Sequence, residues 1–193
     1  MKKNILFGIA ASLMSSVAYA HPGHGESIGF VSGFMHPLLG WDHLLMMLAV
    51  GVWAANIGGR ARWQLPLTFV ATMLLGAIIG AIGITFNAIE STVAAGLIAL
   101  GLVIMMRLAM NRFTQLLFTA VFALMHGLAH GMELSQGSLA QMMMPLLGML
   151  IATAGLHAFG YVLGTQRNRL LSLSQALLAG LMLGLGTNLL LTI

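Results

Sequence analysis

The chain has no cysteine and very few charged side chains. Of its 193 residues only 6% are charged, and four of these are acidic. Without cysteine the chain can form neither a disulfide nor a thiolate-ligated metal site. Because 59% of the residues are hydrophobic and the mean hydropathy is +0.97, the composition lies outside the range of soluble domains. It indicates an integral membrane protein.

The beginning of the chain has the organisation of a cleavable secretory signal. Two lysines precede an apolar run that is too short to span a bilayer, and a triplet of small and aromatic residues follows, ending at Ala20. We therefore expect residues 1–20 to be removed, so that the mature chain starts at His21. Residues 21–193 then form a single transmembrane domain.

Six apolar segments after the signal are each long enough to cross the roughly 30 Å hydrocarbon core as a helix. They lie near residues 28–55, 66–86, 89–106, 113–133, 139–165 and 172–193. We expect an all-α integral membrane protein, a bundle of about six transmembrane helices. Small residues four apart predict close helix packing in lipid. These pairs are Gly76/Gly80, Gly127/Gly131 and Gly180/Gly184.

The basic residues occur in alternate connecting segments. After the signal they are the pairs Arg60/Arg62, Arg107/Arg112 and Arg167/Arg169. The positive-inside rule places these segments in the cytoplasm and both the N-terminus and the C-terminus outside. The net charge of +4 follows from this topology and does not indicate nucleic-acid binding. We expect a multi-pass protein of the bacterial inner membrane, surrounded by the lipid bilayer.

Titratable residues stand inside the first apolar segment, where they are costly. An Asp at the centre of a membrane helix costs about 2.5–3.5 kcal/mol, so such a residue usually faces the bundle interior and has a function. His36 and His43 are seven residues apart, which places them about 20° apart around a helix. Asp42 points about 100° away from His43. Because Pro37 and Gly40 weaken the helix between the histidines, we expect a kink or local unwinding there.

A second polar stripe runs along the fourth segment. His126, His130 and Glu133 have i, i+4, i+7 spacing, which places them within about 60° on one helix face. Gly127 and Gly131 lie on the adjacent face, so another helix can approach the imidazoles closely. The first and fourth segments run in opposite directions. A rise of about 1.5 Å per residue puts both stripes in the outer half of the membrane.

The donor atoms of the two stripes suit a divalent transition-metal ion. Imidazole nitrogen and carboxylate oxygen, without thiolate, favour nickel, cobalt, zinc or copper(II) over calcium and magnesium. The predicted ligands are His36, Asp42, His43, His126, His130 and Glu133. Additional candidates are His157, nearer the cytoplasmic side, and His21 and His24 in the N-terminal tail. His157 could equally bond a neighbouring helix. We expect no cofactor besides the transported ion.

The two stripes resemble the signatures of a known transporter family. Residues 36–43, HPLLGWDH, are similar to the HP-x-x-G-x-DH motif of the HupE/UreJ family of nickel and cobalt permeases. Residues 126–133, HGLAHGME, are similar to its HG-x-AHG-x-E motif, and residues 155–160 to a weaker third block. Met125 stands where the family pattern has an aromatic residue. The resemblance extends over most of the chain and implies secondary uptake of nickel, or in some members cobalt.

Two other functions stay open at this stage. An intramembrane metalloenzyme, of zinc hydrolase or diiron type, could hold a catalytic metal with His126 and His130. A metal-binding accessory membrane protein could bind the ion without transporting it. The permease is favoured, so we expect no enzyme activity. With no phosphate-binding loop, the chain does not drive transport by its own ATP hydrolysis. The sequence leaves open the choice between nickel and cobalt, the coupling ion and the formation of a homo-oligomer.

Overall fold

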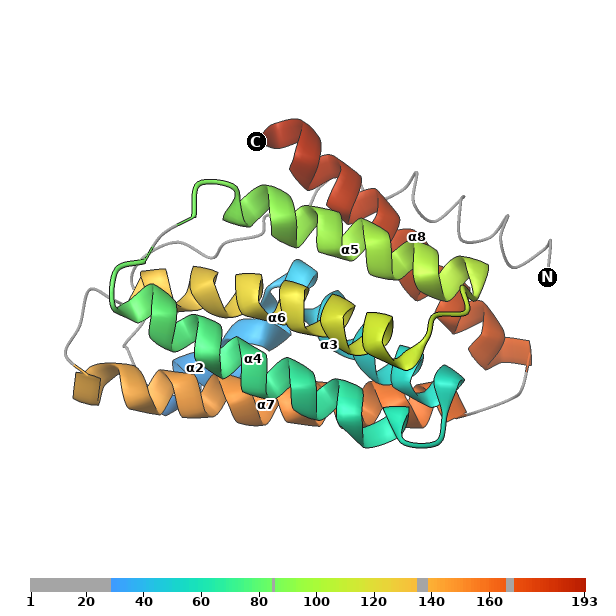
Figure 1. The fold of residues 1–193 in the computed structure, drawn as a ribbon, viewed down its shortest axis with the longest axis horizontal. Helices are drawn as coiled ribbons and strands as arrows, with labels where there is room; N and C mark the ends of the chain where they lie inside the picture. The colour runs from blue at the N-terminus through green and yellow to red at the C-terminus, as the bar shows by residue number, and fades with distance from the viewer. Residues whose placement is uncertain (1–28, 85, 135–138, 166–168) are drawn as a thin grey trace.

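The described part of the chain is entirely α-helical. The computed structural model describes residues 29–84, 86–134, 139–165 and 169–193. The helices are α2 (Phe30–Leu39), α3 (Trp41–Ile57), α4 (Ala61–Ala81), α5 (Ile89–Met106), α6 (Arg112–Leu134), α7 (Leu139–Thr165) and α8 (Arg169–Thr192) (Figure 1). The expected all-α architecture is confirmed for these residues. The predicted signal sequence lies outside them and stays a prediction.

The helices have the length and composition of membrane spans. Helices α4 to α8 are each long and apolar enough to cross a membrane, which makes five candidate spans. Helices α2 and α3 pass the same test only as a pair, and they are bent by 79° where they join. If the bent pair is counted as one span there are up to 6, the number expected from the sequence. The chain is therefore a multi-pass membrane protein.

The bend between α2 and α3 lies at Gly40, where a kink was expected. Gly40 has an extended backbone conformation, with φ −78° and ψ 113°, between two helical segments. Pro37 lies inside α2 and has no N–H to donate to the preceding turn. The break still keeps its backbone hydrogen bonds, because the Gly40 N–H donates to the His36 carbonyl and the Leu44 N–H to the Gly40 carbonyl. The expected kink is confirmed.

Glycines allow the helix backbones to approach closely. A Cβ added to Gly76 would overlap the Leu124 carbonyl of α6, and one added to Gly127 would overlap the Met73 carbonyl of α4. Helices α3 and α7 meet in the same way, with Gly51 against the backbone of His157. The close packing predicted for α4 and α6 is confirmed. For the α8 pair it stays a prediction.

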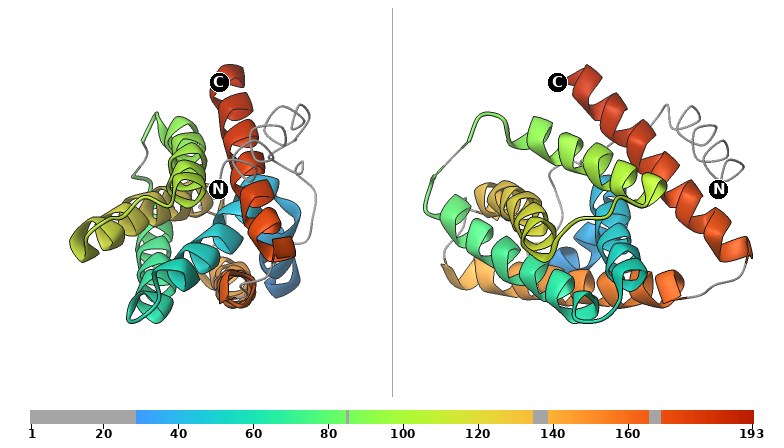
Figure 2. Two further views of the ribbon diagram at one scale, coloured as in Figure 1. Left: turned by 90° about the vertical axis from the view of Figure 1, so that its right-hand side faces the viewer. Right: turned by 45° about the vertical axis from the view of Figure 1, so that its right-hand side comes forward.

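From α3 onward, consecutive helices run in opposite directions, and this separates the charges. The connections that join α3 to α4 and α5 to α6 lie at one end of the bundle, on the right in Figure 1, and the connection from α4 to α5 lies at the other. Arg60, Arg107 and Arg112 therefore share what we call the arginine end. Glu90 in the first turn of α5 and Glu133 near the end of α6 belong to the opposite, acidic end. Helix α8 leans across α5 (Figure 2). The cytoplasmic placement of the arginine end stays a prediction.

Candidate metal centre

Three histidines from three helices meet inside the bundle. His36 of α2, His43 of α3 and His130 of α6 each offer a ring nitrogen, and these three atoms lie within 4.8 Å of one another. We call these residues the histidine cluster. Imidazole nitrogens bind ions such as zinc at about 2.0–2.1 Å, so two nitrogens on one ion are at most about 4.2 Å apart. The nitrogen–nitrogen distances in the cluster, up to 4.8 Å, exceed this limit only slightly, and small side-chain rotations would bring the nitrogens within reach of one ion.

The break at Gly40 creates the cluster. In a straight helix, residues seven apart would be separated by about 10.5 Å along the axis. The ring centroids of His36 and His43 are instead 5.1 Å apart, and that of His130 is 4.8 Å from His36 and 4.6 Å from His43. A Cβ on Gly40 would lie 3.1 Å from Nδ1 of His43 and 3.2 Å from Oδ1 of Asp42. The absence of a side chain at the bend therefore leaves room for these two side chains.

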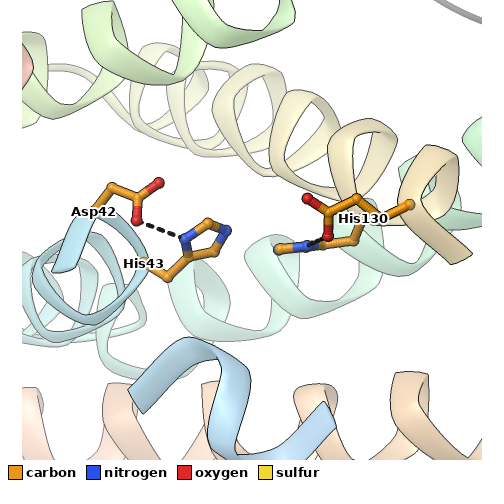
Figure 3. A network of polar contacts seen from close by, with 4 residues as sticks. Asp42, His43 and His130 are labelled. Carbon is orange, nitrogen blue, oxygen red and sulfur yellow. Dashed lines mark hydrogen bonds and ion pairs between the residues drawn. The ribbon is translucent and has the colours of Figure 1, made fainter. Parts of the chain in front are cut away.

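Asp42 lies beside the cluster and orients one of its members. Its Oδ1 is 2.8 Å from Nδ1 of His43, and both side chains are buried (Figure 3). An ionised carboxylate can only accept a hydrogen bond, so Nδ1–H of His43 donates and Nε2 keeps its lone pair. Carboxylates commonly orient metal-binding histidines in this way. The first turn of α3, where Asp42 lies, also favours a negative charge through the helix dipole.

Glu133 lies on the other side of the cluster. Its Oε2 is 3.7 Å from Nδ1 of His130, a distance that is too long for a hydrogen bond but short enough for charge interaction. Neither ring nitrogen of His130 has a hydrogen-bond partner among the described residues, although the side chain is buried. Buried polar atoms in folded proteins usually have a partner. The nitrogens of His130 are therefore suited to an incoming ligand such as a cation.

His126 lies one turn of α6 further from the acidic end. Its Nδ1 is 2.9 Å from the Phe122 carbonyl oxygen, which can only accept, so Nδ1–H donates and Nε2 has the lone pair. This Nε2 is buried without a hydrogen-bond partner in the described structure. The ring of His126 is 5.3 Å from that of His43. His126 is thus a donor next to the cluster, rather than one of its three grouped nitrogens.

A cavity of about 570 Å³ connects the cluster with the acidic end of the bundle. His43 and His130 line it together with Asp42, Glu90 and Glu133. These three carboxylates are all the acidic residues of the described chain. The fold therefore gathers these carboxylates around one cavity, while the arginines at the start of α4 and α6 lie at the opposite end of the bundle. Such a cavity attracts cations.

Glu90 was missed by sequence reasoning. It lies in the first turn of α5, beside a connecting segment, and carries no motif spacing to the histidines. The signal that could have pointed to it is scarcity, because the whole chain has only four acidic residues. Its position across the cavity from α6 depends on how α5 packs, which no local pattern encodes.

The remaining predicted residues lie apart from the cluster. His157 of α7 contacts the ring of Phe69, with a centroid distance of 5.1 Å, and Phe69 lies 5.9 Å from His126. Phe69 of α4, which sequence analysis did not single out, is therefore placed between two imidazoles. His21 and His24 lie outside the described residues and stay predictions. The structure brings the two polar stripes together, and metal binding by them stays a prediction.

Comparison with known proteins places the chain among membrane proteins of one family. The family model described as HupE / UreJ protein matches residues 9–189. Protein HupE of Rhizobium leguminosarum bv. viciae is 36% identical over 160 residues, which cover 82% of this chain and 82% of that protein. No solved structure matches the chain significantly.

Proposed function

Because the chain belongs to the HupE/UreJ family, we propose that it is a permease that takes up a divalent transition-metal cation, Ni²⁺ or Co²⁺, across the bacterial inner membrane. The observation that carries this proposal is the histidine cluster at the end of a carboxylate-lined cavity. Imidazole and carboxylate donors without thiolate suit these borderline ions.

In this proposal the acidic end faces outward and the arginine end faces the cytoplasm, in keeping with the positive-inside rule. Glu90 and Glu133 attract the hydrated cation into the cavity and offset its charge. The cation then exchanges water for the nitrogens of the cluster, and Asp42 keeps His43 in the protonation pattern that exposes Nε2. His126 is the next donor on the way inward.

The membrane potential is sufficient to drive such uptake. A divalent cation that moves inward gains about 4.6 kcal/mol per 100 mV, twice the value for a single charge. Since about 1.4 kcal/mol corresponds to a factor of ten, this supports about a thousandfold accumulation. Binding and release along a polar path are therefore enough, and no coupled chemical step is required.

Transport by the purified chain in liposomes tests the proposal. We expect saturable ⁶³Ni²⁺ uptake that increases with an inside-negative potential and is lost in His130→Ala. A matched control is Thr114→Ala, a half-buried position in the first turn of the same helix, far from His130, which should transport normally. Nickel binding without uptake would instead identify an accessory protein. Lipid hydrolysis without uptake would identify the intramembrane enzyme.

A further inference from the structure

Two polar side chains of α7 are buried away from the histidine cluster. Thr153 and His157 are 0% and 1% exposed, and their i, i+4 spacing places them on one helix face. Among the described residues, no hydrogen-bond partner exists for the hydroxyl of Thr153 or for either ring nitrogen of His157. Buried polar atoms are nearly always paired in folded proteins. Three unpaired atoms on one face therefore call for a ligand.

Thr153 differs from three other helical threonines of this chain. The hydroxyls of Thr72, Thr92 and Thr119 each donate to the carbonyl four residues earlier, at 2.6, 2.7 and 2.9 Å. This local bond is the usual way for a threonine in a membrane helix to satisfy its hydroxyl. Thr153 does not make it, so its hydroxyl remains available to another partner.

The ring of Phe69 lies close to an imidazole of α6 and to the imidazole of this pair. Phe69 lies less than 6 Å, between ring centroids, from both His126 and His157. Phe69 is eight residues from the start of α4 and His157 eight residues from the end of α7, so both lie about 12 Å from the arginine end. Close contact between α7 and Gly51 of α3 fixes the position of this face.

Building on the proposed permease function, we propose that Thr153 and His157 form a second, inner binding site for the transported divalent cation, reached after the cation has passed Phe69. The inner site offers one imidazole nitrogen and one hydroxyl oxygen, with water completing the coordination. Fewer protein ligands make it weaker than the three-imidazole cluster. A weak site suits this position, because conduction requires that each site also release its ion.

A thiol in place of the Thr153 hydroxyl tests the inner site directly. The chain has no cysteine, so Thr153→Cys introduces the sole thiol, in a residue of similar shape. Thiolate binds soft and borderline ions more tightly than a hydroxyl does, and a nickel thiolate absorbs by charge transfer in the near ultraviolet. We expect this band when NiCl₂ is added to purified Thr153→Cys. It should be lost when His157→Gln is added to this variant.

Thr119→Cys is the matched control. Thr119 is also buried and helical, but its hydroxyl is already bonded, so we expect no band there. In liposomes, His157→Gln should lower the maximal ⁶³Ni²⁺ uptake rate about tenfold and leave equilibrium Ni²⁺ binding to the cluster within about twofold, as for a step after binding. His130→Ala should instead remove the equilibrium binding.

The outcomes separate the two proposals. If Thr153→Cys gives no band and His157→Gln transports at the normal rate, while His130→Ala still abolishes uptake, the inner site is wrong and the permease stands. If Thr119→Cys gives the same band as Thr153→Cys, the thiolate signal is not specific and the inner site is also refuted. If the unmodified protein neither binds nor transports Ni²⁺, the proposed function is overturned, and the inner site with it.

Discussion

Removal of the charge on Asp42, without change of shape, should weaken nickel binding by the cluster. In Asp42→Asn the amide oxygen can still accept the hydrogen bond from Nδ1 of His43, now 2.8 Å long. A hydrogen bond to a charged group contributes about 1.5–3 kcal/mol and a neutral one about 0.5–1.5 kcal/mol. The difference of about 1–1.5 kcal/mol corresponds to about tenfold in affinity.

The expected loss of nickel affinity in Asp42→Asn is larger than this tenfold minimum. If the asparagine amide turns, its N–H donates to Nδ1 of His43, the ring proton moves to Nε2, and the metal-binding lone pair is lost. Replacement of such partners of histidine ligands typically costs 10–100-fold in metal affinity. We therefore expect equilibrium dialysis with ⁶³Ni²⁺ to give a dissociation constant raised by about 10–100-fold.

Glu90→Gln is the control that separates charge from hydrogen bonding. It also removes one carboxylate from the cavity lining, but Glu90 lies at the exposed start of α5, where solvent screens its charge. We expect it to slow uptake at low nickel concentration and to change equilibrium affinity by less than Asp42→Asn. If the two variants weaken binding equally, the Asp42–His43 hydrogen bond has no special role and the reasoning is refuted.

Three further predictions concern the geometry and the protonation of the site. Gly40→Ala should lower ⁶³Ni²⁺ uptake severalfold in a folded protein, because the added Cβ presses on Asp42 and His43 at 3.2 and 3.1 Å; normal uptake would show that this contact is unimportant. Gly127→Ala should lower the thermal stability in detergent by about 1–3 kcal/mol through overpacking against Met73, and an unchanged melting temperature would contradict the tight α4–α6 contact. Uptake should fall as the external pH is lowered from about 7.5 to 5 if protons compete with the metal ion for the imidazole nitrogens, because protonated imidazole cannot bind a metal; uptake independent of pH in this range would contradict this proton competition.

The helices and the two polar stripes could be predicted because their signals are local. Segment length predicts membrane helices, and the spacing of His126 and His130 places them on one face whatever surrounds them. Pro37 and Gly40 likewise predicted the break. The direction of the break could not be predicted, because it depends on how α2 packs against α7. That direction decides whether His36 reaches His130.

The parts that were missed depend on contacts between helices. Phe69 stands in an apolar segment where phenylalanine is ordinary, and only the packing of α4 against α6 and α7 places its ring between two imidazoles. The hydrogen bond from His43 to Asp42 in the first turn of α3 was missed as well, because the sequence predicted Asp42 as a metal ligand. Metal binding by Asp42 stays a prediction.

The order of polar groups along the bundle follows from the cost of burying charge. Glu90 and Glu133 are exposed at the acidic end, where water stabilises their charges when no cation is present. Deeper in the bundle an unpaired carboxylate would cost several kcal/mol, and Asp42, the one carboxylate that the described residues place there, is bonded to His43. The deeper donors are imidazoles and a hydroxyl. These groups can be neutral, so burying them without a bound cation does not cost the free energy of burying a charge. In the proposed permease, a path built in this order attracts a cation at its mouth with charge and passes it inward through neutral donors, so that no internal site holds the ion too tightly to release it.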